Sequence, residues 1–412
     1  MAVPTVNAVI NFSSGPGFAQ ACLIDSGVFG TNIFADSASV IVDVSNQINL
    51  IQTNRGRNAT ADQFTVGTLS LRIVDQNGDF NPQNPDSPYA GLLTPMKKVQ
   101  ITATHLGVTY PIFAGFITGY QTIQPKEATD VALTTITAVD ALRLAQNAQI
   151  STVTGATAGD LTGTRINQIL DQIEWPASAR DIDPGLTTVQ ADPGTQRTAL
   201  SALQTISTTE YGAFYVDAVG NFVFQDRNVT VSSIAGTPVI FSDTGSGIYY
   251  KDAAWILNDV LVFNKATVSR AGGGSPQVAI NLPSIEKYFL HSYFIDNLLM
   301  QTDAVALDYA QAYVASRAET SVRCDAITLD LYTPDYDAGI TAALDLDFFD
   351  PITVITTQPG GSYLEKTLQI FGVSNKITPN SFITVFTTLE AIIDGFIIGT
   401  EYGRIGIDSL SY

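Results

Sequence analysis

The chain has 412 residues, of which 45% are hydrophobic and 14% are charged. This length is enough for about two to four domains, and the apolar content excludes a largely disordered chain. Lys and Arg together number 20 and Asp and Glu 39, so the net charge is −19. That balance excludes a protein that holds a nucleic-acid backbone through clustered cations.

Low charge density with abundant Thr, Ser, Asn, Gln and Gly is typical of β-structure that packs against other proteins. The first residues lack a basic segment followed by an apolar run, and no apolar stretch of the sequence is long enough to span a membrane. We therefore expect neither secretion nor a membrane span. Cys22 and Cys324 lack metal-ligand spacing and are expected to be buried, unreactive thiols in a protein made in a reducing cytosol.

The first part of the chain, 6–139, has the pattern of a β domain. Apolar and polar residues alternate over 69–73, as a strand with one buried face requires. Further strands are predicted over 99–103 and 111–117. In the latter, Gly115 indicates a bulge or a close approach of two backbones.

The next segment predicts two short helices and a hairpin. Apolar residues at helical spacing define the first helix, 162–175, with Thr162 as its N-cap. The second helix buries apolar residues over 199–206, and Gly212 is expected to close it in the left-handed conformation. The hairpin is predicted over 214–224.

A second β domain is predicted after a Ser-, Thr- and Gly-rich stretch that ends near residue 247. A strand over 258–269 should form a hairpin with 277–280, and an Ala-rich helix over 302–317 should dock on a sheet. The remaining strands are expected at 326–331, 351–355, 366–373 and 382–389.

The segment after Glu390 is apolar, but Gly395, Gly399, Gly403 and Gly406 exclude a regular helix. Two interpretations stay open. The segment is either an extended arm that lies on a neighbouring subunit or a final strand of the second β domain.

We find no arrangement of residues that predicts an enzyme. His105 and His291 stand in unrelated contexts, so each is interpreted as an ordinary core or surface histidine. The sequence contains no nucleotide-binding, zinc-protease or serine-hydrolase motif. Its many carboxylates give no specific support to a glycoside hydrolase, which is defined by the separation of one carboxylate pair. No catalytic or cofactor-binding residue is predicted.

The stretch 75–79 places oxygen side chains at positions 1, 3 and 5 of a potential calcium loop. Phe80 and Asp86 then stand where such a loop needs Gly and Glu, so an Asx-rich turn is the preferred interpretation. The acidic clusters 335–337 and 345–350 are interpreted as solvated loops. No metal site is predicted.

Several segments have a distinctive order and spacing. They are TNRGR at 53–57, GTLSL at 67–71, DQNGDFNP at 75–82, SPY at 87–89, YPIFAGF at 110–116, DALR at 140–143, the helix start at 195–200, EYG at 210–212 and the hairpin at 220–227. Together they resemble the minor tail proteins of the tail-tip (baseplate) hub of long-tailed bacteriophages. The resemblance extends to about residue 390.

The resemblance implies a structural, non-enzymatic virion protein that forms a ring, usually a trimer with two similar β-barrels per subunit. Such a hub closes the tail tube and provides the channel through which the tape-measure protein and DNA leave. The implied partners are the tail tube or distal tail protein, the tape-measure protein, and a fibre or spike. The net charge of −19 would suit a channel along which DNA slides, because like charges do not adhere.

Two alternatives stay open. One is a distal tail protein, a hexameric ring whose subunit has a single barrel. The other is a carbohydrate-binding host-attachment protein.

The predicted fold is a β-rich α+β protein with two barrel- or sandwich-like β domains that flank a small helical insert. The predicted boundaries are 1–150 for the first β domain, 151–245 for the α+β insert, 246–390 for the second β domain with one docked helix, and 391–412 for the C-terminal arm.

Overall fold

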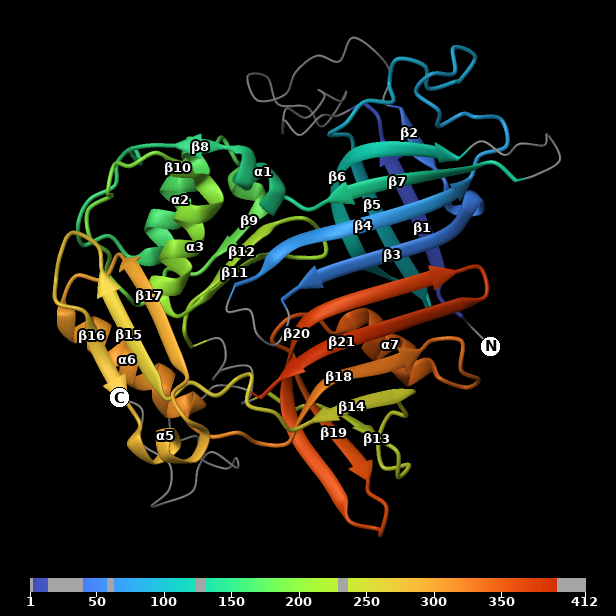
Figure 1. Ribbon diagram of the computed structural model, residues 1–412. Helices are drawn as coiled ribbons and strands as arrows, with labels where there is room; N and C mark the ends of the chain where they lie inside the picture. The colour runs from blue at the N-terminus through green and yellow to red at the C-terminus, as the bar shows by residue number, and fades with distance from the viewer. Residues whose placement is uncertain (1–2, 14–39, 58–62, 124–130, 229–235, 391–412) are drawn as a thin grey trace.

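The computed structural model describes residues 3–13, 40–57, 63–123, 131–228 and 236–390. Within these residues, thirteen strands form one large sheet, and three smaller sheets lie beside it (Figure 1). The predicted β-rich α+β class is confirmed. No helix among the described residues is long and apolar enough to cross a membrane.

The N-terminal half of the large sheet follows the order β3-β4-β7-β6-β5-β1-β2. Its strands are β1 (Thr5–Asn11), β2 (Ile41–Asp43), β3 (Ile48–Gly56), β4 (Thr65–Val74), β5 (Lys98–His105), β6 (Val108–Ile123) and β7 (Leu133–Val139). The alternation predicted over 69–73 is confirmed, because Leu69, Leu71 and Ile73 of β4 are buried. A Cβ atom on Gly115 would collide with the carbonyl oxygen of Val139, so the predicted close approach is also confirmed.

The C-terminal half follows the order β14-β18-β21-β20, and β19 pairs with β20 and with β13. The strands are β13 (Val239–Ser242), β14 (Asp252–Ile256), β18 (Arg323–Asp330), β19 (Pro351–Thr357), β20 (Tyr363–Thr378) and β21 (Ser381–Leu389). The strands predicted at 326–331, 351–355, 366–373 and 382–389 correspond to β18, β19, β20 and β21.

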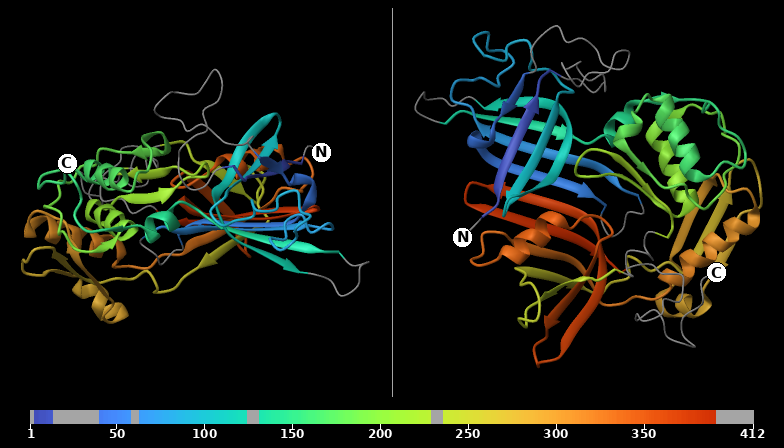
Figure 2. Two further views of the ribbon diagram at one scale, coloured as in Figure 1. Left: turned by 90° about the horizontal axis from the view of Figure 1, so that it is seen from above. Right: turned by 180° about the vertical axis from the view of Figure 1, so that it is seen from behind.

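The two halves join where β3 pairs with β20 in antiparallel register, from Gly56 opposite Gly372 to Ile51 opposite Ile377. Because of this pairing, one hydrophobic core extends through both halves. The helix α7 (Asp337–Asp345) lies on the core side of the sheet, as the views from the front and from behind agree (Figures 1 and 2). The sequence did not predict α7, which begins and ends at residues of the two acidic clusters, Asp337 and Asp345.

The insert has its own core around two packed helices, α2 (Thr162–Gln172) and α3 (Ala199–Glu210). Its other elements are α1 (Leu142–Asn147), β8 (Gln149–Ile150), β9 (Arg180–Ile182), β10 (Arg197–Thr198), β11 (Ala213–Val216) and β12 (Phe222–Gln225). The predicted hairpin is confirmed as the antiparallel pair β11 and β12.

Two predicted helix ends were wrong. The N-cap of α2 is Leu161 and not Thr162, whose hydroxyl instead donates to Glu210 at 2.8 Å. The left-handed residue after α3 is Tyr211, with φ of 64°, and not Gly212. Gly212 has a different reason to be small, because a side chain there would collide with the carbonyl oxygen of Gln225.

A third cluster forms a small α+β layer at the side of the insert. Its sheet has the order β16-β15-β17, with β15 (Lys265–Arg270), β16 (Gln277–Ile280) and β17 (Ser292–Leu298). The helix α6 (Asp303–Arg317) packs on one face of this sheet, and α5 (Leu282–Tyr288) follows β16. The predicted helix 302–317 and hairpin are confirmed, but residues 258–264 are irregular and not part of the strand.

Cys324 is fully buried, and burial raises the pKa of its thiol to about 11, as expected for an unreactive core cysteine. Cys22 and the C-terminal segment 391–412 lie outside the described residues. The division of the chain at residues 150, 245 and 390 stays a prediction.

Candidate functional site

No other helix or strand of the described residues covers one broad face of the large sheet, where β18, β21, β20, β3, β4 and β7 lie side by side (Figure 1). These strands bury every second side chain on the core side, so the alternate residues point away from the core. The face crosses the junction between the two halves without a break. We call it the open face.

The open face is polar but carries little charge. Its polar residues are Gln52, Asn54, Thr68, Ser70, Arg72, Thr135, Thr137, Thr328, Asp330, Ser374, Lys376 and Thr387. Ile383, Val385 and Val139 add aliphatic side chains. The charged members are Arg72, Lys376 and Asp330, so the acidic excess of the chain does not come from this face.

A hydrogen bond between Ser374 and Asn54, at 3.0 Å, crosses the junction on this face. Thr118 and Thr137 are joined in the same way at 3.0 Å. Such contacts between short neutral side chains stabilise the pairing of neighbouring strands.

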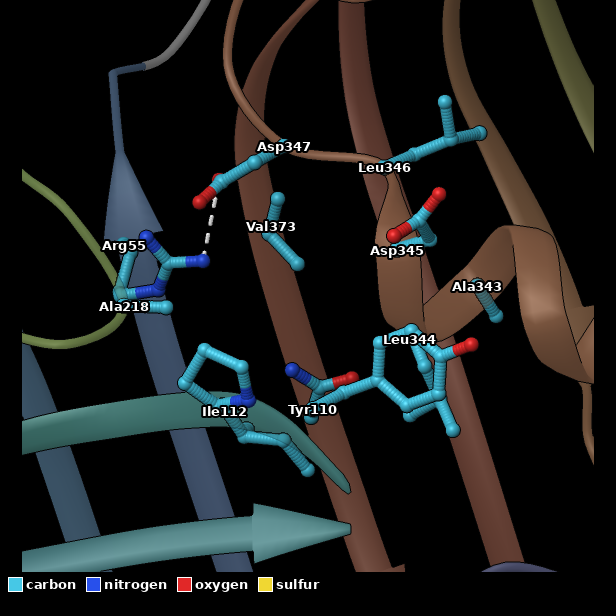
Figure 3. A pocket seen from close by; sticks show the side chains of 12 residues that line it. Arg55, Tyr110, Ile112, Ala218, Ala343, Leu344, Asp345, Leu346, Asp347 and Val373 are labelled. Atoms are coloured by element: carbon cyan, nitrogen blue, oxygen red, sulfur yellow. Dashed lines mark hydrogen bonds and ion pairs between the residues drawn. The ribbon is translucent and has the colours of Figure 1, made fainter. Parts of the chain in front are cut away.

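On the opposite side of the sheet, a pocket of about 100 Å³ lies where both halves meet the insert (Figure 3). It is lined by β6, by the end of α7, by β20 and by Ala218 in the turn of the insert hairpin. Within it, Arg55 Nη2 lies 3.0 Å from Asp347 Oδ1. Arg55 is 6% exposed, and its pair with Asp347 closes the junction from inside. The Nε and Nη1 atoms of Arg55 have no hydrogen-bond partner among the described residues.

Aromatic rings complete the junction. Phe64, Tyr215 and Phe348 come from the N-terminal half, the insert and the C-terminal half, and their ring centroids are 5.0 to 5.2 Å apart. The Arg55 guanidinium lies 5.0 Å from the centroid of the Phe348 ring. These contacts fix the three parts of the chain against one another.

Asp140 lies beside the same junction. It accepts hydrogen bonds from the backbone of Gly67 at 2.7 Å and of Leu142 at 3.0 Å. Burial raises the pKa of Asp140 to about 7, although these hydrogen bonds and the charge of Arg55 act in the opposite direction.

Two solved structures are similar to the chain over nearly its whole length. The 43 kDa tail protein of prophage MuSo2 from Shewanella oneidensis is 15% identical with a TM-score of 0.54, and the match covers 94% of this chain and 99% of that protein. The tail protein from Neisseria meningitidis MC58 is 11% identical with a TM-score of 0.56, and the match covers 94% and 96%. The chain has the fold of phage tail proteins. No protein-family model and no curated protein sequence matches it.

The tail-protein fold brings some of the residues considered above into contacts that the sequence did not predict. His105 is 2% exposed, and its Nε2 lies 3.4 Å from Asp337 at the start of α7. His291 Nε2 lies 3.7 Å from Asp259. The first contact joins the end of β5 to the start of α7, and the second joins the residue before β17 to the irregular stretch 258–264. Both ring nitrogens of His105 are buried and have no hydrogen-bond partner among the described residues. The interpretation of the two residues as ordinary histidines stays a prediction.

The acidic segments of the tail-protein fold also have local roles. Asp75 accepts from the backbone of Asp79 at 2.7 Å and of Phe80 at 3.1 Å, which is the predicted Asx turn. In the cluster 345–350, Asp347 pairs with Arg55. The interpretation of this cluster as a solvated loop is therefore wrong at that position. No group of metal-ligating side chains is present among the described residues.

The role of Glu210, in the EYG segment, was not predicted from the sequence. Glu210 is fully buried and accepts from the hydroxyl of Thr162 and the backbone of Thr187, both at 2.8 Å. It also pairs with Arg227 at 3.2 Å. The segment therefore ties α2, α3 and the end of the hairpin together within the tail-protein fold. A Glu at a helix end followed by a distant Arg was the only signal in the sequence.

Proposed function

We propose that the chain is a structural, non-enzymatic subunit of a tail-tip hub ring that closes the tail tube of a phage. The observation that carries this proposal is the continuous sheet that β3 and β20 create across the two halves. A subunit of this kind can contribute a long, smooth segment to the wall of a ring. The two similar structures, whose names describe tail proteins, support the same assignment.

In this proposal the open face lines the channel. Backbone phosphates bind where Lys and Arg gather, and Arg72 and Lys376 are the only cations among the residues named above for that face. A surface of Thr, Ser, Asn and Gln is wetted but holds a passing polyanion weakly. The tape-measure protein and DNA would therefore move through the ring without specific binding.

The oligomer is proposed to be a trimer, because each subunit supplies two β halves and three subunits then give a pseudo-sixfold ring. The strand β14 ends the path of the large sheet, and its second edge pairs with no strand of the described residues. Such an edge suits strand addition between neighbours. The tube or distal tail protein, the tape-measure protein and a fibre or spike are the proposed further partners. The protein would be made in the host cytoplasm and located at the virion tail tip.

A distal tail ring is the second candidate. The first β half, taken by itself, is compatible with this candidate. A subunit with a single barrel would need six copies to form a ring that three two-barrel subunits form. The second β half, which pairs directly with the first, favours the hub.

The mass of the purified chain in solution, measured by light scattering with negative-stain imaging, distinguishes these proposals. We expect a trimer with an open channel and a pseudo-sixfold outline. A hexamer would favour the distal tail ring. A chain that stays a monomer at all concentrations, and that forms no ring on its own, would contradict the hub proposal.

A further inference from the structure

The small sheet β16-β15-β17 carries an exposed apolar patch on the face away from α6. Val278, Ile280 and Phe294 lie on that face of the sheet and are exposed by 42%, 51% and 65%. Leu282 and Phe289, at the two ends of the adjoining helix α5, are exposed by 66% and 80%. We call these residues the β16–β17 patch. A group of large apolar side chains this exposed marks a surface that another segment covers.

The register of the sheet explains the patch. Thr267 of β15 lies between Val278 and Phe294, and Lys265 lies between Ile280 and Ser292. The intervening residues of β15, Ala266 and Val268, are fully buried against α6. One face of the sheet is therefore a core. The other face has apolar side chains on its two outer strands, on either side of Thr267 and Lys265, and has no cover among the described residues.

The chain leaves the described structure beside this patch. Glu390, which follows β21, accepts a hydrogen bond from Ser321 at 2.8 Å. Two residues earlier, Glu319 pairs with Lys287 at 2.6 Å and accepts from the hydroxyl of Tyr288 at 2.9 Å. Tyr288 directly precedes Phe289 of the patch. These contacts link Glu390, through residues 319–321, to the end of α5 next to Phe289.

The segment 391–412 has the chemistry and the length to cover the patch. It contains the apolar runs 392–393 and 396–398, and at about 3.3 Å per residue it can extend about 70 Å. Its acidic residues outnumber its one cation, Arg404. They would lie against a sheet face that has Lys265 among its apolar side chains.

We propose that the C-terminal segment 391–412 docks on the β16–β17 patch of its own chain. Its apolar residues cover Val278, Ile280 and Phe294. This contact does not depend on the ring function, because it forms within one chain.

Limited trypsin digestion of the full chain tests the proposal, because Arg404 is the only cleavage position in the segment. The readout is the rate at which the peptide 405–412 is released, measured by mass spectrometry. In the unaltered chain we expect release about tenfold slower than from a synthetic 391–412 peptide. Release at the peptide's rate would overturn the proposal.

Matched variants locate the contact. Phe294→Ser removes a patch residue that is 65% exposed, and Leu106→Ser removes a residue that is 66% exposed in the turn between β5 and β6. Ile280→Ser and Val108→Ser, exposed by 51% and 52%, form a second pair. We expect the patch variants to speed release about tenfold and the controls to leave it unchanged, while all four keep the thermal midpoint of the parent.

Two results would overturn docking within one chain. Equal release from the patch variants and their controls would place the segment elsewhere, for example as a strand of the large sheet. Protection that disappears on dilution, together with a mass above one chain, would place the segment on a second copy.

Discussion

Arg55 of β3 and Asp347 after α7 are separated by 292 positions in the sequence, yet their side chains pair at 3.0 Å. The pair lies where the N-terminal and C-terminal halves of the large sheet meet. Arg55 is nearly buried, whereas the side chain of Asp347 is 34% exposed. Removal of either partner leaves a charge that the junction can hydrate only in part.

The Asp347→Asn substitution should therefore weaken the junction. We expect a loss of about 1–3 kcal/mol in the free energy of unfolding, which is below the value for a fully buried pair because solvent screens Asp347. Urea unfolding followed by fluorescence measures it. Asp335→Asn is the matched control, since Asp335 is exposed and Asn also tolerates its positive φ of 52°. Equal effects of the two substitutions would contradict the role of the ion pair.

The backbone approach between β3 and β20 gives a second prediction. Gly56 has φ of 109°, and a methyl group there would overlap the Phe371 carbonyl oxygen and lie 2.6 Å from Gly372 Cα. Gly56→Ala should lower stability by roughly 3 kcal/mol or more, because both strain and overlap oppose folding. Gly107→Ala has positive φ but open space, so about 1 kcal/mol is expected. If the thermal midpoint of Gly56→Ala is as high as that of Gly107→Ala, β3 and β20 can move apart without loss of stability, and the prediction is wrong.

Asp140 should make the stability of the junction depend on pH. Its folded pKa of about 7 lies above its ordinary value of 3.8, so the folded chain binds this proton more tightly than the unfolded chain. The resulting stabilisation is complete below about pH 4 and is lost as the pH rises to about 7. Asp140→Asn removes this titration. The stability of the variant relative to the parent should therefore increase between pH 4 and pH 8, at about 1.4 kcal/mol per unit of pKa shift. A constant difference between the two melting curves across this range would refute the prediction.

Glu210 should be the most sensitive polar position of the insert. Glu210→Ala leaves Thr162, the Thr187 backbone and Arg227 without their common acceptor, and a loss of about 3 kcal/mol is expected. Glu210→Gln keeps one acceptor oxygen and should lose less. Glu174→Gln, at an exposed position, should be neutral. Hydrogen exchange in α2 and α3 reports the effect locally, and unchanged protection in Glu210→Ala would argue against this account.

Local pattern was enough to predict much of the fold. The alternation of Leu69 and Leu71 defined β4, and the spacing of Ile166, Ile169 and Leu170 defined α2. These signals depend on neighbours a few residues away. The EYG and YPIFAGF segments led to the resemblance with tail proteins, and the two similar structures are tail proteins with the same fold.

The remaining features depend on contacts between distant residues, which one sequence does not reveal. The pairing of β3 with β20 joins residues 51–56 to 372–377. Thr162 looked like a helix cap because Thr is common there, but Glu210, 48 positions later, takes its hydroxyl. The open face could not be predicted either, since its residues are ordinary Thr, Ser, Asn and Gln until the sheet places them together.

A reconstruction of the ring formed by the purified chain, at a resolution that separates strands, tests the central claim most directly. If the account is right, the wall of the channel consists of the open face, with Gln52, Asn54 and Ser374 directed into the lumen. A ring in which this face is packed against protein or turned outward, with the α7 side facing the channel, would contradict it.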